Sequence, residues 1–484
     1  MNLAEALEIH ARAQPEHPAV IAGTTTVTHA DFAARVRDLA AGLLERGIRP
    51  GDLVGVCLSD SIDHLVANFA VIRMGAVLLP MDLRWTRAEQ QRLAMHFGCT
   101  LVLAETDAAP LVGVACASMA ATMGQGATPI APGGDAPLLL SLSSGTTGRP
   151  KGPLITHAHM LRRFWTHWMN IGLNASERYV SATPLYFGGG RTFAMSVLFS
   201  GGTVILFPPP FRAPDLLAEL ARTRATSAFL VPTQLRKLLA EADAVLAPAR
   251  ALRTLISSGA PLDPEERRDL CTRVCANFIE YYASTEGGGV SISTPATRTH
   301  APDSVGRPVF AVEAQVVDDA HTPLPAGQVG RFRYRGPGVA DSYHMDDEAS
   351  RDAFHDGWFY PGDLAEIDAG GHITLRGRTK DMIIRGGVNI HPGEIETILR
   401  DHSSVRDAAV VGWPSKTLGE EVAAFVVTEG PTDAEVLTDW CRSQLAPYKV
   451  PALFVSLDDM PRNSAGKVLK AKLATRLPDR DGGA

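Results

Sequence analysis

Hydrophobic and polar positions in the first 300 residues of the chain follow two alternating patterns. In residues 32–44 and again in 62–74, apolar side chains recur every three or four positions, which predicts amphipathic helices. Continuous apolar runs at 53–58 and 76–80 predict buried strands. Because helices and strands alternate, we expect an α/β fold whose subdomains are built in layers.

The pattern changes after about residue 303. Short apolar runs separated by turn residues, at 311–317, 329–334 and 372–375, predict a small β-rich subdomain. From residue 381 onward helical and strand-like segments alternate again over about 100 residues, which is the size of a separate small domain. We therefore predict a mixed α/β protein, with a large N-terminal domain of layered α/β subdomains, the β-rich subdomain, and a small C-terminal α+β domain.

Length and charge narrow the function classes. A chain of 484 residues exceeds what one hydrophobic core usually supports, so two or more domains are expected. The formal net charge of −7 argues against a nucleic-acid partner, which usually meets a basic face. We interpret this mild acidic excess as a charge that keeps a large protein in solution.

Cysteine usage and hydropathy indicate the compartment. The six cysteines form no Cys-x-x-Cys pair, so they signal neither a zinc site nor a redox motif, and reduced thiols are expected. The acidic, helical N-terminus does not suit a signal peptide, and the apolar stretches are interrupted before they could span a membrane. A cytoplasmic protein is expected, and the oligomeric state, a homodimer included, stays open.

The strongest chemical signal is the segment Ser-Leu-Ser-Ser-Gly-Thr-Thr-Gly-Arg-Pro-Lys-Gly at residues 141–152, which follows the apolar run 138–140. Glycines let backbone N–H groups approach an anion, hydroxyls add donors, and Lys151 adds positive charge. These features predict a loop that holds phosphates. It differs from the common nucleotide loop because Lys151 is followed by Gly152 instead of Ser or Thr. Taken alone, the segment has a weaker alternative as a Ser/Gly-rich surface turn.

Further polar motifs follow in a fixed order. They are Tyr-Tyr-Ala-Ser-Thr-Glu-Gly-Gly at 281–288, Tyr-Pro-Gly-Asp at 360–363, Gly-Arg-Thr-Lys-Asp-Met-Ile-Ile-Arg-Gly-Gly at 377–387 and Pro-Arg-Asn-Ser-Ala-Gly-Lys at 461–467. With this ordered set, the chain resembles the adenylate-forming superfamily of acyl-CoA synthetases, amino-acid adenylation domains and luciferases. The resemblance covers nearly the whole chain.

The resemblance implies that the protein activates a carboxylic acid with ATP, with Mg²⁺ as cofactor. The carboxylate would attack the α-phosphate to give an acyl-adenylate and pyrophosphate, and a thiol would then attack the adenylate. The implied nucleotide site comprises Ser143, Ser144, Gly145, Thr146, Thr147, Gly148 and Lys151 at the β- and γ-phosphates, Ser258, Gly259, Ala260 and Pro261 at the adenine, and Tyr281 and Tyr282, of which Tyr282 stacks on the adenine.

The same resemblance implies the catalytic groups. Lys467 would bridge the substrate carboxylate and the α-phosphate, Thr285 would donate to the α-phosphate, and Glu286 would ligate Mg²⁺. Asp363 would accept hydrogen bonds from the ribose hydroxyls, and Arg378 would also reach the ribose. Outside these motifs, the same charged residues would be read as solvated loop or surface side chains.

A domain movement is also implied. Lys380 lies where relatives have a hinge, which divides the chain into an adenylating domain, residues 1–379, and a mobile domain, residues 380–484. Rotation at the hinge would withdraw Lys467 and bring in Gly386 and Gly387 to line a channel for the thiol. The alternative is that Lys380 is an ordinary linker residue.

The implied acid pocket includes Tyr186, Phe187, Gly188, Gly189 and Arg191. Amino-acid adenylation domains place an Asp beside the aromatic residue, where this chain has Phe187, so an amino-acid substrate is disfavoured. The glycines either widen the pocket or form a tight turn that opens the next helix. Arg191 either pairs with a second acidic group on the substrate or lies on a solvated helix face.

The acceptor of the acyl group is expected to be CoA, because the chain contains no recognisable phosphopantetheine-bearing segment and ends soon after Lys467. A carrier protein or an amine is the alternative acceptor. A non-catalytic nucleotide-binding protein is the alternative from another class, which the intact Glu286, Asp363 and Lys467 disfavour. Aryl, alicyclic and medium-chain acids all remain open as the substrate.

Overall fold

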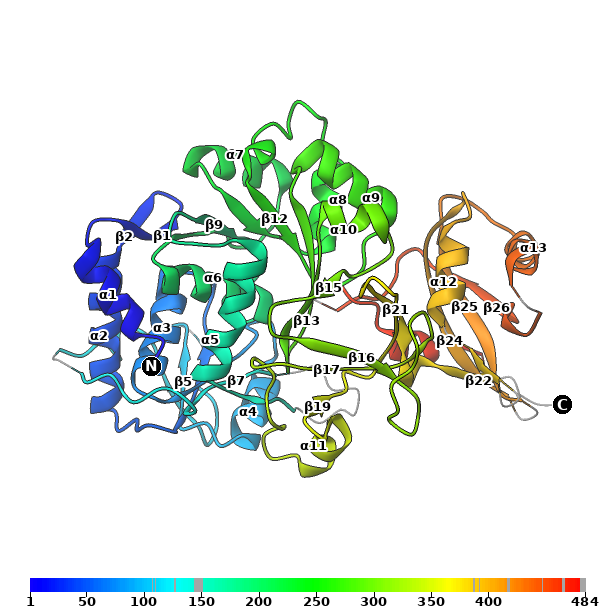
Figure 1. Ribbon diagram of the computed structural model, residues 1–484. Helices are drawn as coiled ribbons and strands as arrows, with labels where there is room; N and C mark the ends of the chain where they lie inside the picture. Colours follow the sequence, from blue (N-terminus) through cyan, green and yellow to red (C-terminus); the bar gives the residue numbers. More distant parts are fainter. Residues whose placement is uncertain are drawn as a thin grey trace. The chain divides into compact units, whose positions relative to one another are not determined.

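In a computed structural model the chain forms two compact units (Figure 1). The first consists of Met1–Glu313 and Tyr334–Phe359, and the second of Ala314–Arg333 and Tyr360–Ala484. The structure describes all residues except 107, 109, 126–127, 143–150, 386–387, 391, 416–417, 446, 464–465 and 479–484.

The first unit contains a nine-stranded sheet with a parallel centre. Its strands are, in spatial order, β15 (Arg307–Pro308), β14 (Gly288–Ser293), β13 (Phe278–Ser284), β12 (Thr254–Ser257), β11 (Ser227–Phe229), β9 (Arg178–Ser181), β10 (Thr203–Leu206), β1 (Pro18–Ala22) and β2 (Thr25–Thr28). The pairs β1–β2, β13–β14 and β14–β15 are antiparallel. The parallel centre is buried on both faces, as such sheets usually are.

Successive residues of the central strands enter different hydrophobic cores. On β9, Tyr179 belongs to the core that contains Phe32 of α2 (His29–Glu45) and Phe193 of α6 (Gly188–Ser200). Val180 belongs to the core that contains Leu216 of α7 (Ala213–Thr223). This follows from the two-residue period of a strand, which directs neighbouring side chains to opposite faces of the sheet. The sheet is therefore covered by helices on both faces, as the alternation in the sequence predicts.

A second sheet of the first unit has the order β6-β5-β3-β4-β7-β8 and is parallel except for the pair β7–β8. Its strands are β6 (Ala115–Ala117), β5 (Leu101–Ala104), β3 (Leu53–Cys57), β4 (Val77–Pro80), β7 (Pro137–Leu140) and β8 (Leu154–Thr156). Strands β3 and β4 confirm the runs predicted at 53–58 and 76–80. Strand β7 leads into residues 143–150, which lie outside the described residues.

The helices of the first unit are α1 (Glu5–Ala13), α2 (His29–Glu45), α3 (Ile62–Arg73), α4 (Arg87–His96), α5 (His157–Thr166), η1 (His167–Ile171), α6 (Gly188–Ser200), α7 (Ala213–Thr223), α8 (Pro232–Leu239), η2 (Ala249–Ala251), α9 (Pro264–Asp269), η3 (Leu270–Val274), α10 (Pro295–His300) and α11 (Asp347–Ala353). Helices α2 and α3 confirm the helical patterns at 32–44 and 62–74. Throughout the described part of the chain, every helix is too short or too polar to cross a lipid bilayer.

The second unit begins with the β-rich segment. Its strands are β16 (Glu313–Val317), β17 (Gly330–Arg335), β20 (Asp363–Ile367) and β21 (Ile373–Arg378). Strand β20 pairs antiparallel with both β17 and β21. The last residues of β17 belong to the first unit, where Tyr334 pairs with Phe359 of the short strand β19 (Trp358–Phe359). Strand β19 also pairs antiparallel with β18 (Phe354–His355).

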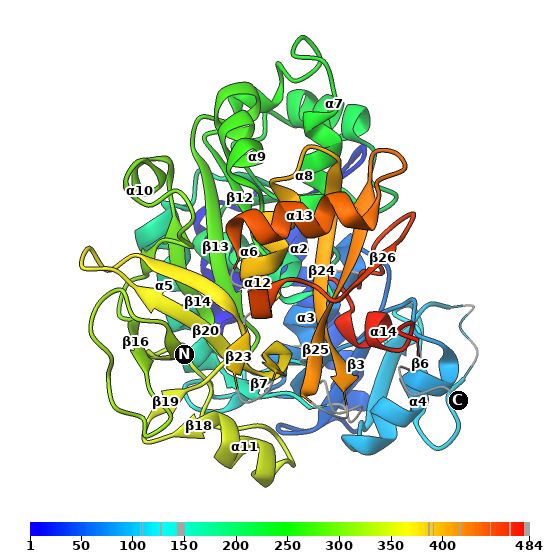
Figure 2. The ribbon, with the colours of Figure 1, turned by 90° about the vertical axis from the view of Figure 1, so that its right-hand side faces the viewer.

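The remainder of the second unit is built on a long antiparallel pair, β24 (Val405–Ser415) and β25 (Gly419–Thr428), which run side by side (Figure 2). The other elements are η4 (Thr379–Asp381), β22 (Ile383–Arg385), β23 (Val388–Ile390), α12 (Pro392–Arg400), α13 (Ala434–Gln444), η5 (Pro447–Lys449), β26 (Leu453–Ser456) and α14 (Lys470–Ala474). Val410 packs with Ile395 of α12, whereas the adjacent Val411 packs with Leu473 of α14. The predicted mixed α/β class is confirmed, while the domain boundary at 379/380 stays a prediction.

Candidate active site

Two of the predicted nucleotide segments lie at the same edge of the nine-stranded sheet. Ser258–Pro261 directly follows β12, and Thr285 and Glu286 form the turn between β13 and β14. Strands β12 and β13 are neighbours and parallel, so both segments leave the sheet at its carboxyl edge. Ligands of open α/β sheets bind at this edge.

The two adjacent tyrosines of β13 have different surroundings. Tyr281 is 6% exposed, its hydroxyl shares a 2.8 Å hydrogen bond with Thr166 Oγ1, and its ring lies edge-on to His167 and Phe193. Burial raises the pKa of Tyr281 to about 12. Tyr282 is half-buried, and the alternation of the strand directs it to the opposite face. Tyr281 thus packs in the core, whereas Tyr282, predicted to stack on the adenine, is directed to the other face of the sheet.

Glu286 and Lys151 converge on one aromatic side chain, Tyr343. The Glu286 side chain is buried, and Tyr343 Oη donates to its Oε1 at 2.8 Å. Lys151 Nζ lies 4.4 Å from the ring centre of Tyr343. The structure therefore brings together two predicted site residues that are far apart in sequence. The other predicted residues of the phosphate loop, from Ser143 to Gly148, lie outside the described residues.

A buried arginine of α5 holds the turn that carries Thr285 and Glu286. The Arg163 guanidinium donates to the carbonyl oxygens of Thr285 at 3.2 Å, Glu286 at 2.6 Å and Gly338 at 2.8 Å. Burial lowers the pKa of Arg163 to about 10. Gly288, with φ of +70°, allows the approach, because a Cβ there would lie 2.7 Å from Arg163 Cγ.

Sequence reasoning missed both Arg163 and Tyr343. Arg163 stands beside Phe164 and three residues after Met160, both of which are fully buried. A charged residue on the apolar face of a helix was the available signal, because buried charges are almost always paired or hydrogen-bonded. Tyr343 lies in a loop, and nothing in the local pattern distinguishes it.

The predicted acid-pocket segment begins α6. Phe187 is the N-cap residue, and Gly188 and Gly189 form the first turn of the helix, which confirms the interpretation that the glycines open a helix. The rings of Tyr186 and Phe187 are 4.7 Å apart. A Cβ on Gly189 would lie 2.7 Å from the ring of Phe229, so this glycine allows close packing.

Two residues outside the predicted motifs also contact this aromatic pair. Arg84 lies 5.4 Å from the ring centre of Tyr186 and 5.7 Å from that of Phe187. Its guanidinium forms a bidentate ion pair with Asp82, in which Nε donates to Oδ1 at 2.9 Å and Nη2 donates to Oδ2 at 2.6 Å. Burial, and then the charge of Asp82, raise the pKa of Tyr186.

The main chain of the same segment is held by two charged side chains. The Leu185 N–H donates to Asp60 Oδ1 at 2.8 Å, and burial raises the pKa of Asp60 to about 6. Arg191 is 2% exposed, and its Nη1 donates to the carbonyl oxygens of Leu185 at 3.2 Å and Tyr186 at 3.0 Å. Burial lowers the pKa of Arg191 to about 9. The alternative that Arg191 lies on a solvated helix face is therefore wrong.

In the second unit, Asp363 and Arg378 are paired across β20 and β21. Arg378 Nε donates to Asp363 Oδ1 at 2.9 Å, and Asp363 is 9% exposed. The Lys467 side chain is exposed at the surface, yet partial desolvation, followed by the positive charge of Arg378, lowers its pKa. Asp363 and Asp381 act in the opposite direction. These charges of the predicted ribose and catalytic groups thus lie within electrostatic range of one another.

The predicted hinge lies in the short turn η4, which connects β21 to β22 and contains Lys380. Gly386 and Gly387, predicted to line the thiol channel, lie outside the described residues. No described segment contains three or more His, Cys, Asp or Glu side chains grouped as a metal cage.

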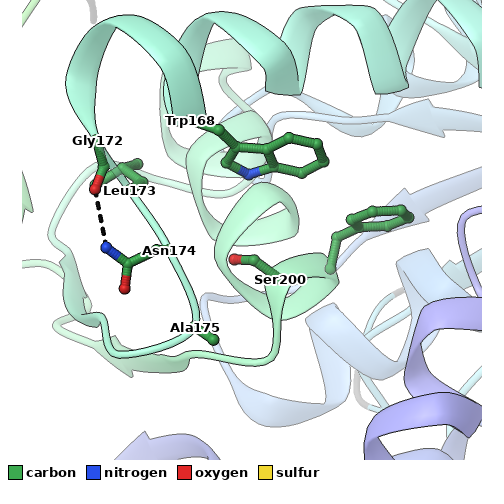
Figure 3. Close-up of a pocket in the computed structure, with 7 residues that line it drawn as sticks. Trp168, Gly172, Leu173, Asn174, Ala175 and Ser200 are labelled. Atoms are coloured by element: carbon green, nitrogen blue, oxygen red, sulfur yellow. Dashed lines mark hydrogen bonds between the residues drawn. The ribbon is translucent and has the colours of Figure 1, made fainter.

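A surface hollow of about 560 Å³ lies at the other end of α6 from Gly188. It is lined by Trp168, Gly172, Leu173, Asn174, Ala175, Phe199 and Ser200, and the Asn174 amide donates to the carbonyl oxygen of Gly172 (Figure 3). A helix of 13 residues spans about 20 Å, so this hollow is separate from the acid-pocket segment.

Comparison with known proteins identifies the family. Residues 7–344 match the family described as AMP-binding enzyme, and residues 394–467 match the AMP-binding enzyme C-terminal domain. The chain belongs to the AMP-binding enzyme family. This membership confirms the family that the ordered motifs predict.

Relatives match over nearly their full length. The chain is 32% identical over 479 residues to a feruloyl-CoA synthase from Amycolatopsis sp, covering 96% of this chain and 97% of the relative. Its fold is similar to ATP-bound MatB from Rhodopseudomonas palustris, with a TM-score of 0.90, 28% identity, and coverage of 98% and 99%. It is also similar to o-succinylbenzoate CoA synthetase (MenE) from Bacillus subtilis in complex with the acyl-adenylate intermediate OSB-AMP, with a TM-score of 0.88, 28% identity and 97% coverage of both chains.

Proposed function

We propose that the protein is an AMP-forming acid–thiol ligase that activates a carboxylic acid with ATP and transfers the acyl group to CoA. The observation that carries the proposal is the convergence of buried Glu286 and Lys151 on Tyr343 in a member of the AMP-binding enzyme family. In the first step the acid displaces pyrophosphate from the α-phosphate. In the second step the CoA thiol displaces AMP from the acyl-adenylate.

The residues present fit a bound Mg²⁺ ion. Magnesium in nucleotide enzymes is usually held by one or two carboxylates together with substrate phosphates and water, so a cage of protein ligands is not required. The Glu286 side chain is buried and accepts the Tyr343 hydroxyl, and Lys151 lies over the ring of the same tyrosine. When bound, the ion would neutralise charge on the phosphates. Glu286 is the residue that would hold it.

Further residues of the chain orient the nucleotide in this proposal. Lys151 and the loop from Ser143 to Gly148 bind the leaving pyrophosphate, and Tyr282 stacks on the adenine beside the segment 258–261. Asp363 accepts hydrogen bonds from the ribose hydroxyls, with Arg378 beside it. This arrangement fixes the α-phosphate for attack, which is the main source of rate enhancement in a displacement at phosphorus.

Charge that develops at the α-phosphate is stabilised by Thr285 and Lys467. The Thr285 hydroxyl donates to a phosphate oxygen, and the Lys467 ammonium bridges that oxygen and the attacking carboxylate. A flexible point charge suits a contact that forms as the charge develops. Partial desolvation, followed by the charge of Arg378, lowers the pKa of Lys467, while Asp363 and Asp381 act in the opposite direction.

The acid lies against the segment that opens α6. The rings of Tyr186 and Phe187 form one wall, which supports a flat, apolar acyl group such as that of an aryl acid. Gly189 lets the first turn of α6 pack closely on the ring of Phe229. Arg191 shapes this wall through the carbonyl oxygens of Leu185 and Tyr186.

The second step uses a different arrangement of the C-terminal part. Residues 380–484 rotate about a hinge near Lys380, Lys467 leaves the site, and Gly386 and Gly387 line the path of the CoA thiol. We also propose a cytoplasmic location, which the six free cysteines support, because disulfides persist mainly in oxidising compartments.

The test is acid-dependent exchange of pyrophosphate into ATP, measured over a panel of aryl, alicyclic and medium-chain acids with Mg²⁺. At least one acid should drive exchange, and addition of CoA should give AMP, pyrophosphate and an acyl-CoA of the expected mass. Formation of ADP and phosphate instead would refute the proposal. An acyl-adenylate that accumulates in the presence of CoA would contradict CoA as the acceptor.

A further inference from the structure

We infer that Tyr343 is a positioning residue that joins the phosphate loop to the metal carboxylate, so that Lys151 and Glu286 keep one fixed relation. The inference rests on the proposed function. It is carried by three separate contacts of one residue: through the hydroxyl, the ring and the main chain.

The hydroxyl contact gives the two oxygens of the Glu286 carboxylate different roles. Tyr343 is 7% exposed and donates to Glu286 Oε1 at 2.8 Å. Among the described residues, no side chain or backbone group donates to Oε2 of Glu286. A hydrogen bond to one oxygen fixes the rotation of the carboxylate and directs the other oxygen to the cation. Tyr343 therefore leaves Oε2 as the oxygen of Glu286 that would hold a bound cation.

The ring contact reaches the phosphate loop. Lys151 Nζ lies 4.4 Å from the ring centre of Tyr343, within the range of a cation–π interaction. Phe354 packs edge-on against the same ring, with the ring centres 5.4 Å apart. The ring is therefore held in place while it supports the ammonium group.

The main-chain contact ties the same residue to the end of the loop. Tyr343 forms an antiparallel bridge with Pro153, and the N–H of the next residue, His344, donates to the carbonyl oxygen of Gly152 at 2.8 Å. The Tyr343 N–H donates to Ser350 Oγ at 2.9 Å. Because the backbone, ring and hydroxyl belong to one residue, Tyr343 links the segment that leaves the loop to Glu286.

This arrangement predicts a specific defect when the hydroxyl is removed. In Tyr343→Phe the ring still packs on Lys151 and Phe354, but Glu286 loses the bond that orients it. Binding of ATP without metal should be unchanged. The additional affinity gained with Mg²⁺ should fall about ten-fold or more, the effect of losing one hydrogen bond to a charged group.

The experiment measures ATP binding by calorimetry to the whole chain, in EDTA and in Mg²⁺, for the parent protein, Tyr343→Phe and Tyr343→Leu. Tyr343→Leu also removes the ring beneath Lys151 and should weaken metal-free ATP binding as well. Tyr179→Phe is the matched control, because Tyr179 is a fully buried tyrosine of the same unit in the core at β9. It should bind as the parent protein does in both conditions.

A double-mutant cycle with Glu286→Gln provides a second measurement. The Mg²⁺-dependent losses of Tyr343→Phe and Glu286→Gln should be non-additive, because both act on one contact. Three results would overturn the inference alone. Tyr343→Phe could keep the Mg²⁺-dependent gain in ATP affinity, it could lose equal affinity with and without metal, or the losses of affinity in the two variants could be additive. A parent protein that binds no ATP would instead overturn the proposed function, and the inference with it.

Discussion

Replacement of Arg163 by methionine tests how the turn that carries Thr285 and Glu286 is held. Methionine keeps most of the volume but removes donors to three carbonyl oxygens. The Ala340 N–H still donates to the oxygen of Glu286 at 2.9 Å, so two carbonyl oxygens, of Thr285 and Gly338, lose the donor that the structure gives them.

The magnitude follows from these two oxygens. A buried acceptor left without a donor costs about 1–3 kcal/mol, which gives about 4 kcal/mol for the pair. Removal of the buried charge offsets part of this loss of stability, because burial of the Arg163 guanidinium is itself unfavourable and lowers its pKa to about 10. We expect a net loss of about 3 kcal/mol in the free energy of unfolding, and at least a ten-fold loss of exchange activity in the protein that remains folded.

Urea denaturation and acid-dependent ATP–pyrophosphate exchange check the two effects separately. Arg163→Lys keeps the charge, but a single ammonium cannot reproduce the planar fork that reaches three acceptors, so activity should fall there too. The control is Arg162→Met, since Arg162 is half-buried and makes only a 3.4 Å contact with the carbonyl oxygen of Pro337. The assigned role of Arg163 would be refuted if the free energy of unfolding of Arg163→Met were within 1 kcal/mol of the parent value and its exchange activity were unchanged.

Three further changes probe other parts of the molecule. Lys467→Ala should raise the adenylation barrier by about 3 kcal/mol in the exchange assay. Lys472→Ala, at an exposed position of α14, should leave the barrier unchanged. If the two variants exchange pyrophosphate equally fast, Lys467 does not have the proposed role. Asp60 has a folded-state pKa raised from 3.8 to about 6, so its favourable contribution to stability is present below pH 4 and lost as the pH rises through 6. Asp60→Asn should therefore be more stable than the parent protein by about 2 kcal/mol at pH 8 but not at pH 4, and a difference independent of pH in urea titrations would contradict this. Gly288→Ala adds a Cβ 2.7 Å from Arg163 Cγ at a φ of +70°, so thermal denaturation should show a loss of about 2 kcal/mol; an unchanged melting temperature would show that the turn can yield.

The sequence nominated candidate site residues where these belong to a continuous motif. Glu286, Asp363 and Arg378 could be nominated because each lies within a short run whose order along the chain is itself informative. The alternation of helices and strands likewise predicted α2, α3, β3 and β4. The period of a strand could also have separated Tyr281 from Tyr282, but it could not say which of them faces the core.

Contacts between distant segments could not be predicted. Arg163 meets Glu286 across 123 residues of sequence, and Tyr343 meets it across 57, so no local window contains both partners. The interpretation of Arg191 as a solvated helix residue failed for the same reason. Its burial depends on the elements that pack around the first turn of α6, which the pattern of α6 alone does not specify.

The path of the chain through the two units has a consequence for synthesis on the ribosome. The first unit includes Tyr334–Phe359, which follows a stretch, Ala314–Arg333, that belongs to the second. Strand β13 and Glu286 therefore leave the ribosome well before Tyr343, which supplies a hydrogen bond to the buried carboxylate. Until residue 359 has emerged, the first unit is incomplete in the nascent chain. Before Gly338 and Tyr343 have been made, Arg163 lacks one of its carbonyl acceptors and the Glu286 carboxylate lacks its hydrogen-bond donor.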